Sequence, residues 1–166
     1  FGVFNDSLGS VSPYIQNVTT VFMFLFGVNF SIYYLLLLKE FRSAFKDEEL
    51  RLYIGIILVS ILLIVLNIRP IYNTLEETIR HAAFQVGSII TTTGYSTCDF
   101  DLWPTTAKLV LVLLMFIGAC AGSTGGGIKV SRFLIVGKTV RKEIGSYVHP
   151  KSVKKIQMDG KPIEHE

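Results

Sequence analysis

Two long stretches of this chain carry no charged side chain, and they limit the folds that the sequence allows. Residues 18–38 and residues 52–68 lack Lys, Arg, Asp and Glu, and each is about long enough to cross the hydrocarbon core of a bilayer as a helix. Charged residues make up only 17% of the chain, against about 25% in an average soluble domain. We therefore expect an all-α membrane protein that is embedded in a lipid bilayer.

The basic residues are unevenly distributed along the chain. Of the 16 Lys and Arg residues, nine follow residue 128 and four lie within residues 39–51, which leaves three elsewhere. Because Lys and Arg accumulate on the cytoplasmic side of membrane proteins, we expect residues 39–51 and residues 143–166 to be cytoplasmic. A basic tail is also typical of nucleic-acid binding. Its position beside a membrane helix favours topology as the explanation, and we expect no nucleic-acid partner.

A serine followed by a proline predicts the start of the first helix. Ser12 is a suitable N-cap and Pro13 suits the first helical position, so we expect one helix from Pro13 to about Leu38. Asn29 falls at mid-depth in this helix. Because a polar side chain in lipid needs a partner, we expect Asn29 to bond a neighbouring helix rather than to contact an ion.

A short amphipathic segment precedes a turn rich in threonine. Thr74 and Glu77 have the spacing of a capping box and predict a helix over residues 75–90. At 1.5 Å per residue this helix is only about 24 Å long, and its charges are confined to the first two turns. We expect it to enter the membrane from outside and to stop partway. The sequence Thr-Thr-Thr-Gly-Tyr-Ser-Thr over residues 91–97 then returns outward.

This arrangement predicts a re-entrant pore helix and a filter loop. Non-helical backbone is tolerated at membrane depth where protein surrounds it or where it lines a water-filled cavity. The C-terminal end of a helix favours a cation, and Gly94 can adopt the left-handed dihedral angles that align carbonyl groups. We interpret the turn as one wall of a cation filter; the alternative is a plain surface turn. Asp99 and Asp101 either concentrate cations at the mouth or are ordinary solvated loop residues.

Ten consecutive small residues interrupt the last apolar segment. Helical composition runs from Pro104 to about Lys142, and a continuous helix of that length would extend about 58 Å, nearly twice the hydrocarbon thickness. Residues 118–127 read Gly-Ala-Cys-Ala-Gly-Ser-Thr-Gly-Gly-Gly, and each glycine costs about 1 kcal/mol relative to alanine in a helix. We expect a broken helix with a loop below the filter, and interpret the loop as a gate. The alternative is a helix-packing face built on Gly118 and Gly122.

Other kinds of site are not indicated. A nucleotide-binding P-loop needs Gly-Lys-Ser/Thr, but Gly127 is followed by Ile128 and only then by Lys129. The three histidines are scattered, and no nucleophile is arranged with a base, so we expect neither an enzyme nor a cofactor. Cys98 and Cys120 should lie at different depths and stay unpaired. The chain begins with Phe rather than Met, and we expect it to be a piece of a longer protein.

Two motifs resemble one known family. The turn over residues 91–97, followed by Gly-Ala-Cys-Ala-Gly-Ser-Thr-Gly-Gly-Gly-Ile-Lys-Val over residues 118–130, is similar to the TrkH/KtrB family of bacterial potassium-uptake membrane subunits. The second motif is the more specific of the two, and the resemblance covers essentially the whole chain. It implies four helix–pore helix–helix repeats around a central pore in each full-length subunit.

The resemblance also divides the chain and assigns its sites. Residues 1–38 would be the outer segment and closing helix of the second repeat, and residues 39–51 a cytoplasmic connection. Residues 52–142 would be a complete third repeat, and residues 143–166 a cytoplasmic linker to a missing further repeat. The potassium-coordinating backbone carbonyl groups would be those of Thr92, Thr93, Gly94 and Tyr95. The intramembrane gating loop would contain Gly118, Gly122, Ser123, Thr124, Gly125, Gly126 and Gly127.

Partners and transport mode follow from the same resemblance. It implies a bacterial cytoplasmic membrane protein, a homodimer of full-length subunits and a cytosolic ring of nucleotide-binding regulatory subunits. Ser96 stands where tetrameric potassium channels have a second filter glycine, which leaves selectivity between K⁺ and Na⁺ open. Passive conduction and coupling to Na⁺ or H⁺ also stay open. We expect part of a potassium transporter or channel pore subunit; the alternatives are a small homotetrameric cation channel and a non-conducting membrane scaffold.

Overall fold

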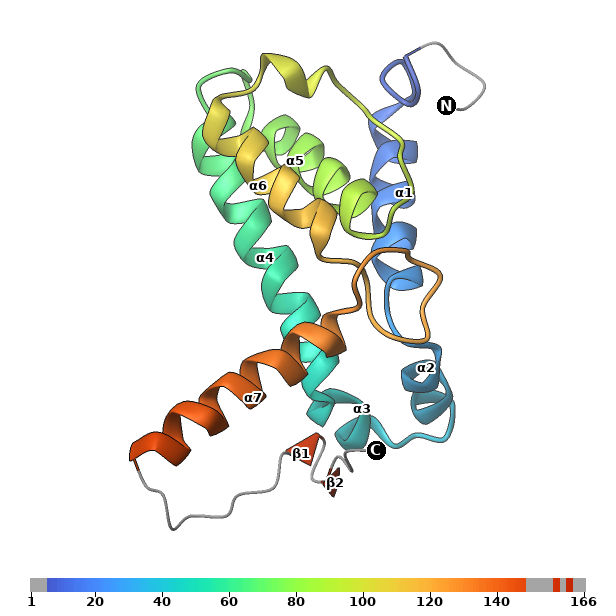
Figure 1. Ribbon diagram of the computed structural model, residues 1–166. Helices are drawn as coiled ribbons and strands as arrows, with labels where there is room; N and C mark the ends of the chain where they lie inside the picture. The colour runs from blue at the N-terminus through green and yellow to red at the C-terminus, as the bar shows by residue number, and fades with distance from the viewer. Residues whose placement is uncertain (1–5, 149–156, 159–160, 163–166) are drawn as a thin grey trace.

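The computed structural model describes residues 6–148, 157–158 and 161–162. These residues form a helical chain with one minimal antiparallel strand pair near its end (Figure 1). The expectation of an all-α membrane fold is confirmed, apart from that pair. In order, the elements are α1 (Pro13–Phe26), α2 (Phe30–Leu37), α3 (Phe41–Lys46), α4 (Glu48–Ile68), α5 (Leu75–Ile90), the 3-10 helix η1 (Phe100–Leu102), α6 (Thr105–Phe116), α7 (Val130–Val148), β1 (Gln157–Met158) and β2 (Lys161–Pro162).

Helix α5 lies inside the group formed by the other long helices. It packs against α1 on one side and against α4 and α6 on the other (Figure 1). Nine of its 16 residues are buried, and Phe84, Val86 and Ile90 are fully so. Its acidic residues, Glu76 and Glu77, lie in the first turn. α5 is therefore a short helix that is surrounded by protein, as expected for a re-entrant pore helix.

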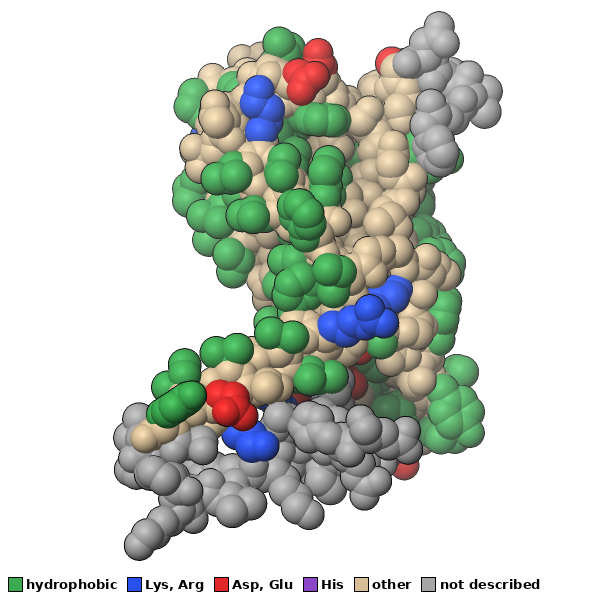
Figure 2. All heavy atoms as spheres, viewed as in Figure 1, with side chains coloured by type: hydrophobic (Ala, Val, Ile, Leu, Met, Phe, Trp, Pro, Cys, Tyr) green, Lys and Arg blue, Asp and Glu red, His purple; other side chains and the backbone are tan. Residues whose placement is uncertain are grey.

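One described helix is long and apolar enough to cross a membrane by itself. This is α4, with 21 residues. Leu58, Leu62 and Leu66 of α4 are each more than half exposed, and an apolar stripe of this kind marks a surface that meets lipid or other protein. Figure 2 shows hydrophobic side chains spread over the visible face of α4 and α6. α6 has only 12 residues, so it stops short of a full span.

The single helix expected over residues 13–38 is wrong, because the chain bends in its middle. α1 ends at Phe26 and α2 begins at Phe30, and the two helices are bent by 92°. Asn29 is the N-cap of α2, and its side chain accepts a hydrogen bond from the amide of Ser31 at 2.9 Å. The bond that Asn29 makes is therefore a cap, not the helix-to-helix bond that the sequence suggests.

Helix α4 begins ahead of its expected start at residue 52. Asp47 is its N-cap, and the Asp47 carboxylate accepts a hydrogen bond from the amide of Leu50 at 2.7 Å. Glu48 and Glu49 then occupy the first turn, where acidic side chains complement the helix dipole. Charged residues that the hydropathy pattern assigns to a connection thus belong to the helix.

The interruption expected in the last apolar segment is present. α6 ends at Phe116 and α7 begins at Val130, and no residue of 117–129 is helical. α7 then runs to Val148, into the stretch that the sequence predicts as a linker. The rest of that stretch lies outside the described residues, except for β1 and β2.

Candidate functional site

The turn that follows α5, here called the threonine turn (residues 91–97), is neither helix nor strand. Thr92 and Gly94 have φ angles of +57° and +84°, so Gly94 uses the conformational freedom expected of it. Thr92 is the unexpected member, because a β-branched residue is rarely found in the left-handed region. Strain of this kind costs about 1–3 kcal/mol and clusters at functional sites.

The last turn of α5 holds the threonine turn through hydroxyl and amide groups. Thr91 Oγ1 donates to the carbonyl of Gly87 at 2.7 Å and lies 2.7 Å from Thr93 Oγ1. The amides of Thr93 and Gly94 both donate to the carbonyl of Ser88, at 2.9 Å and 3.4 Å. Hydroxyl and amide bonds together therefore tie the threonine turn to the last turn of α5.

Three consecutive carbonyl groups of the threonine turn are left available. Within the part of the chain that the structure describes, no donor bonds the carbonyl oxygens of Thr92, Thr93 and Gly94. The Tyr95 carbonyl differs, because it accepts the Ser88 hydroxyl at 2.5 Å. Backbone oxygens without a donor are costly at membrane depth, and a dehydrated cation is a partner that such oxygens can take.

Helix α5 adds an electrostatic contribution. Its N-terminus is capped as expected, with Thr74 Oγ1 accepting the amide of Glu77 at 3.2 Å. The first turn is acidic, whereas the last turn has no basic residue. The partial negative charge at the C-terminal end is therefore not offset by a side chain of α5 itself, and it lies directly before the threonine turn.

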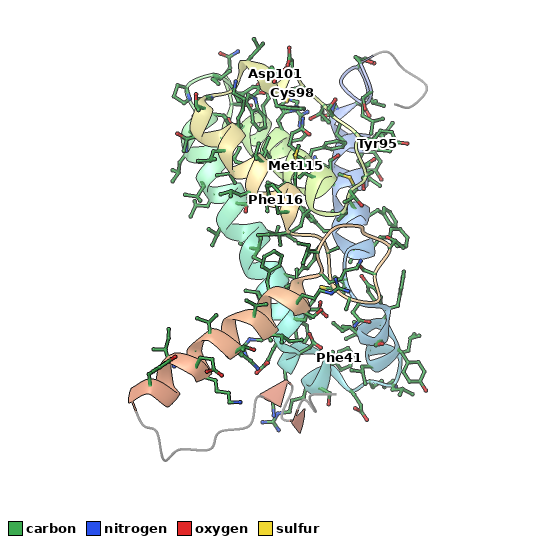
Figure 3. All side chains as sticks on the ribbon, in the orientation of Figure 1. Phe41, Tyr95, Cys98, Asp101, Met115 and Phe116 are labelled. Atoms are coloured by element: carbon green, nitrogen blue, oxygen red, sulfur yellow. The ribbon has the colours of Figure 1, made fainter. Side chains whose placement is uncertain are left out.

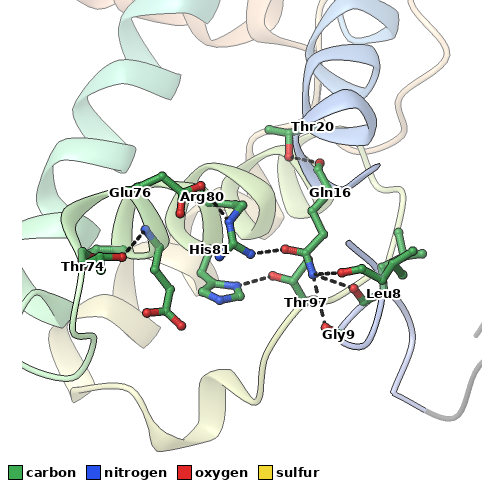
Figure 4. A network of polar contacts seen from close by, with 12 residues as sticks. Leu8, Gly9, Gln16, Thr20, Thr74, Glu76, Arg80, His81 and Thr97 are labelled. Carbon is green, nitrogen blue, oxygen red and sulfur yellow. Dashed lines mark hydrogen bonds and ion pairs between the residues drawn. The ribbon is translucent and has the colours of Figure 1, made fainter. Parts of the chain in front are cut away.

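A buried polar network anchors the outer end of the threonine turn (Figure 4). Gln16 of α1 is 1% exposed, donates to the carbonyl of Leu8 at 2.8 Å and accepts a bond from Arg80 of α5. His81, next to Arg80, has its Nδ1 2.8 Å from Thr97 Oγ1. The network thus connects α1, α5 and Leu8 with the outer end of the threonine turn at Thr97. The sequence pattern does not predict these contacts.

An open cleft of about 510 Å³ lies at the outer end of the threonine turn. Gly94, Asp6, Asp99 and Asp101 are among its lining residues. Figure 3 shows Asp101 at the end of the molecule opposite to Phe41. Asp99 also accepts the amide of Asp101 at 3.0 Å, which is an ordinary loop contact. Cation attraction and loop structure, the two roles that the sequence allows for Asp99 and Asp101, both fit this geometry.

The segment between α6 and α7, here called the glycine loop (residues 117–129), depends on its glycines. Gly122 and Gly127 have φ angles of +65° and +74°. A Cβ atom on Gly118 would lie 2.1 Å from the carbonyl oxygen of Gly126, so the loop packs closely on itself. Because the segment is not helical, a face for helix packing does not describe it.

The glycine loop touches the threonine turn. The amide of Gly126 donates to Thr92 Oγ1 at 2.8 Å, and a Cβ atom on Gly125 would lie 3.5 Å from the carbonyl oxygen of Thr91. Within the loop, Lys129 Nζ donates to the carbonyl of Gly125. The two candidate sites that the sequence indicates separately are therefore in direct contact.

The other side of the glycine loop pairs with the bend between α1 and α2. The amide of Cys120 donates to the carbonyl of Gly27 at 3.0 Å, and the amide of Phe30 donates to the carbonyl of Gly122 at 3.2 Å. A helix end leaves backbone groups without partners, and here the loop supplies them. This explains why a continuous helix over residues 13–38 is the wrong expectation: the partners that permit the bend come from far along the chain.

The polar side chains of the glycine loop also bond protein. Ser123 Oγ donates to the carbonyl of Cys120 at 2.6 Å, and Thr124 Oγ1 donates to the carbonyl of Phe26 at 3.2 Å. Cys98 and Cys120 are both free cysteines, as expected, and Cys120 is completely buried.

Sequence reasoning misses Glu49, which lies in the first turn of α4. Its side chain is 3% exposed, and its Oε1 accepts the amide of Ala121 at 2.7 Å and the amide of Ser131 at 2.9 Å. In sequence, Glu49 is one of several charges at a predicted connection. Its position at the start of a long apolar helix is the signal that favours a buried role over a solvated one.

The TrkH family, described as cation transport proteins, matches the chain over residues 1–166. This chain belongs to the TrkH family. The Trk system potassium uptake protein TrkH of Escherichia coli strain K12 is 35% identical over 98% of this chain and 35% of its own length. The corresponding TrkH of Salmonella typhimurium is 36% identical over 92% of this chain and 32% of its own length.

A solved structure of a TrkH protein shares the fold. The crystal structure of the potassium transporter TrkH from Vibrio parahaemolyticus has a TM-score of 0.88 to this chain at 32% identity, covering 98% of this chain and 36% of that one. The chain thus spans about a third of the length of the relatives it matches. Membership of the TrkH family confirms the membrane fold that the sequence predicts.

Proposed function

We propose that this chain supplies one wall of the potassium filter in a pore subunit of the TrkH family. The observation that carries the proposal is the run of carbonyl oxygens of Thr92, Thr93 and Gly94, which no donor bonds among the described residues. Such oxygens can replace the hydration shell of a monovalent cation. Tyr95 would be the fourth residue of the wall; its carbonyl also accepts the Ser88 hydroxyl. The names of the similar proteins, potassium uptake and transporter proteins, point to K⁺ as the ion.

The glycine loop is proposed as the gate of this pore. Its contact with Thr92 supports a location next to the filter on the side away from the outer cleft. A loop without regular structure can change conformation without melting a helix. The residues of the gate would be Gly118, Gly122, Ser123, Thr124, Gly125, Gly126 and Gly127.

The complete pore would need further repeats of the same full-length chain. One filter wall cannot surround an ion, and the relatives are about three times as long as this chain, which supports several repeats in one chain over a small homotetrameric channel. We extend the proposal to residues 1–38 as the end of one repeat and residues 52–142 as the next. Residues 39–51 and 143–166 would be cytoplasmic in a bacterial inner membrane. A homodimer and a cytosolic nucleotide-binding ring complete the proposal, with transport passive or coupled to Na⁺ or H⁺.

The filter assignment is tested by replacing Gly94 in the full-length protein. Gly94→Asp places a side chain at a φ of +84°, where an L-residue is strained by about 1–2 kcal/mol, and sets a carboxylate beside the ion path. We expect rubidium uptake by potassium-transport-deficient cells to fall at least tenfold.

Gly55→Ala is the matched control, because a Cβ atom on Gly55 of α4 meets nothing within 4 Å; it should transport normally. Both variants are compared at equal amounts in the membrane. Undiminished uptake by Gly94→Asp would remove the filter assignment and favour a non-conducting scaffold role for this segment.

A further inference from the structure

One buried carboxylate bonds both the glycine loop and the start of α7. Glu49 Oε1 accepts the amide of Ala121 at 2.7 Å, early in the loop, and the amide of Ser131 at 2.9 Å, just after it. The residues between these two amides include Gly126, whose amide reaches Thr92. A single oxygen atom on α4 therefore closes the segment that contacts the threonine turn.

The carboxylate has no basic partner in the part of the chain that the structure describes. The ion pairs found there are Arg80–Glu76 and Lys138–Glu48, although Glu49 is 3% exposed. A buried charge needs compensation, and here backbone amides supply it. Ser131 is the second residue of α7, so its amide is one of those that a helix leaves without an intrahelical acceptor. The positive end of the α7 dipole adds to the attraction.

We infer that Glu49 is a positioning residue that holds the glycine loop in its place against the filter. Removing the carboxylate deprives the amides of Ala121 and Ser131 of their shared acceptor at once, and these two amides lie on either side of Gly126 along the chain. The loop then keeps its bonds to the bend and to Thr92 but loses those to α4, so it moves away from Thr92 more readily, while the threonine turn keeps its own bonds to α5. This inference rests on the proposed gate, but the position of the loop can be measured independently of transport.

Cys120 provides that measurement. It is completely buried and next to Ala121 in the chain. A water-soluble maleimide therefore reaches its thiol only when the glycine loop moves away from Glu49. Cys98, on the outer loop, is an internal reference; burial raises the pKa of its thiol above the ordinary value, which slows its reaction equally in all variants. Labelling of each cysteine is followed by peptide mass spectrometry in the full-length protein in membranes.

Three variants separate the roles of Glu49. Glu49→Ala should raise the labelling rate of Cys120 at least tenfold, leave Cys98 unchanged and increase basal rubidium flux. Glu49→Gln keeps a neutral acceptor oxygen and should give an intermediate rate. Glu48→Ala is the matched control, because it removes the neighbouring carboxylate, which bonds Lys138 of α7; the labelling rate of Cys120 should stay that of the unaltered protein.

The outcomes distinguish the positioning role of Glu49 from the gating role of the glycine loop. Unchanged labelling of Cys120 in both Glu49 variants would overturn the positioning role, as would an equal rise at Cys98, which would indicate general loosening. Faster labelling of Cys120 without increased flux would uphold the role of Glu49 and refute the gate. If Glu49→Ala does not reach the membrane, the labelling rate of Glu49→Gln alone decides, because this variant retains the size and the hydrogen-bonding oxygen of the original side chain.

Discussion

The threonine turn and the glycine loop are both non-helical segments inside a helical protein, but they are held in different ways. The threonine turn bonds mainly to the helix that precedes it, through the carbonyl groups of Gly87 and Ser88. The glycine loop bonds to distant parts of the chain: the bend between α1 and α2, Glu49 on α4 and Thr92.

The two segments therefore differ in what would have to change before either could move. Bonds to the preceding helix persist as long as α5 is folded, and α5 is buried along most of its length. Bonds between distant segments can break together when one segment shifts, without unfolding either helix. Segments with separable contacts of this kind belong to the low-stability end of a protein. We expect the threonine turn to stay in place while the glycine loop moves.

Shortening the glycine loop should have the largest effect on basal rubidium flux, and it tests this contrast between the two segments. Deleting two residues within 122–127 removes bonds to the bend and to Thr92. At about 1 kcal/mol for each hydrogen bond, losing two raises the population of the displaced loop roughly tenfold to thirtyfold. Basal rubidium flux through the full-length protein should rise accordingly, with K⁺ still preferred over larger cations. Unchanged flux would refute the gate and leave the loop as a structural element.

A smaller effect is expected from Thr92, whose side chain lies in the threonine turn and bonds the glycine loop. Thr92→Val keeps the shape of the residue but removes the hydroxyl that accepts the amide of Gly126 and donates to the carbonyl of Thr91. Losing the contact with the glycine loop corresponds to about 1 kcal/mol, so basal flux should rise several-fold. Thr92→Ser retains the hydroxyl and should restore low flux. If both variants leak equally, the hydroxyl does not link the turn to the loop.

The smallest effect on transport is expected at the outer anchor. Gln16→Leu removes the donor to the part-buried carbonyl of Leu8 and one of the two acceptors of Arg80, which keeps Glu76, at a cost of about 1–3 kcal/mol. The midpoint of thermal unfolding should fall by several degrees, while uptake at low temperature changes little. Asn17→Leu, an exposed amide on the same helix, is the control and should leave the midpoint unchanged. A strong loss of uptake without loss of stability would show that the network shapes the filter directly.

Much of the fold can be predicted from the sequence because membrane helices follow local rules. The charge-free stretch 52–68 indicates α4, and Thr74 with Glu77 indicates the start of α5, which the structure has over Leu75–Ile90. The run of small residues after Phe116 indicates a break because glycine destabilises a helix wherever it lies. These features depend on composition and on neighbours within a few positions.

Other features of the candidate site depend on residues that are distant in the sequence. Residues 18–38 carry no charge that would mark the end of a helix, yet the chain bends at Gly27, where the glycine loop bonds the backbone. Glu49 looks like a solvated charge until α7 brings the amide of Ser131 to it. The left-handed φ of Thr92 runs against the preference of its side chain.

The sequence by itself therefore determined the class of fold and the short helix α5, and it indicated the two candidate sites, because hydropathy, caps and glycine act locally. Only the tertiary structure decided that the two sites touch, that a bend replaces a straight helix, and that one carboxylate closes the loop. The physical reason is that a buried backbone group bonds whichever partner the fold brings within reach. The local sequence pattern does not predict which distant residue that partner is.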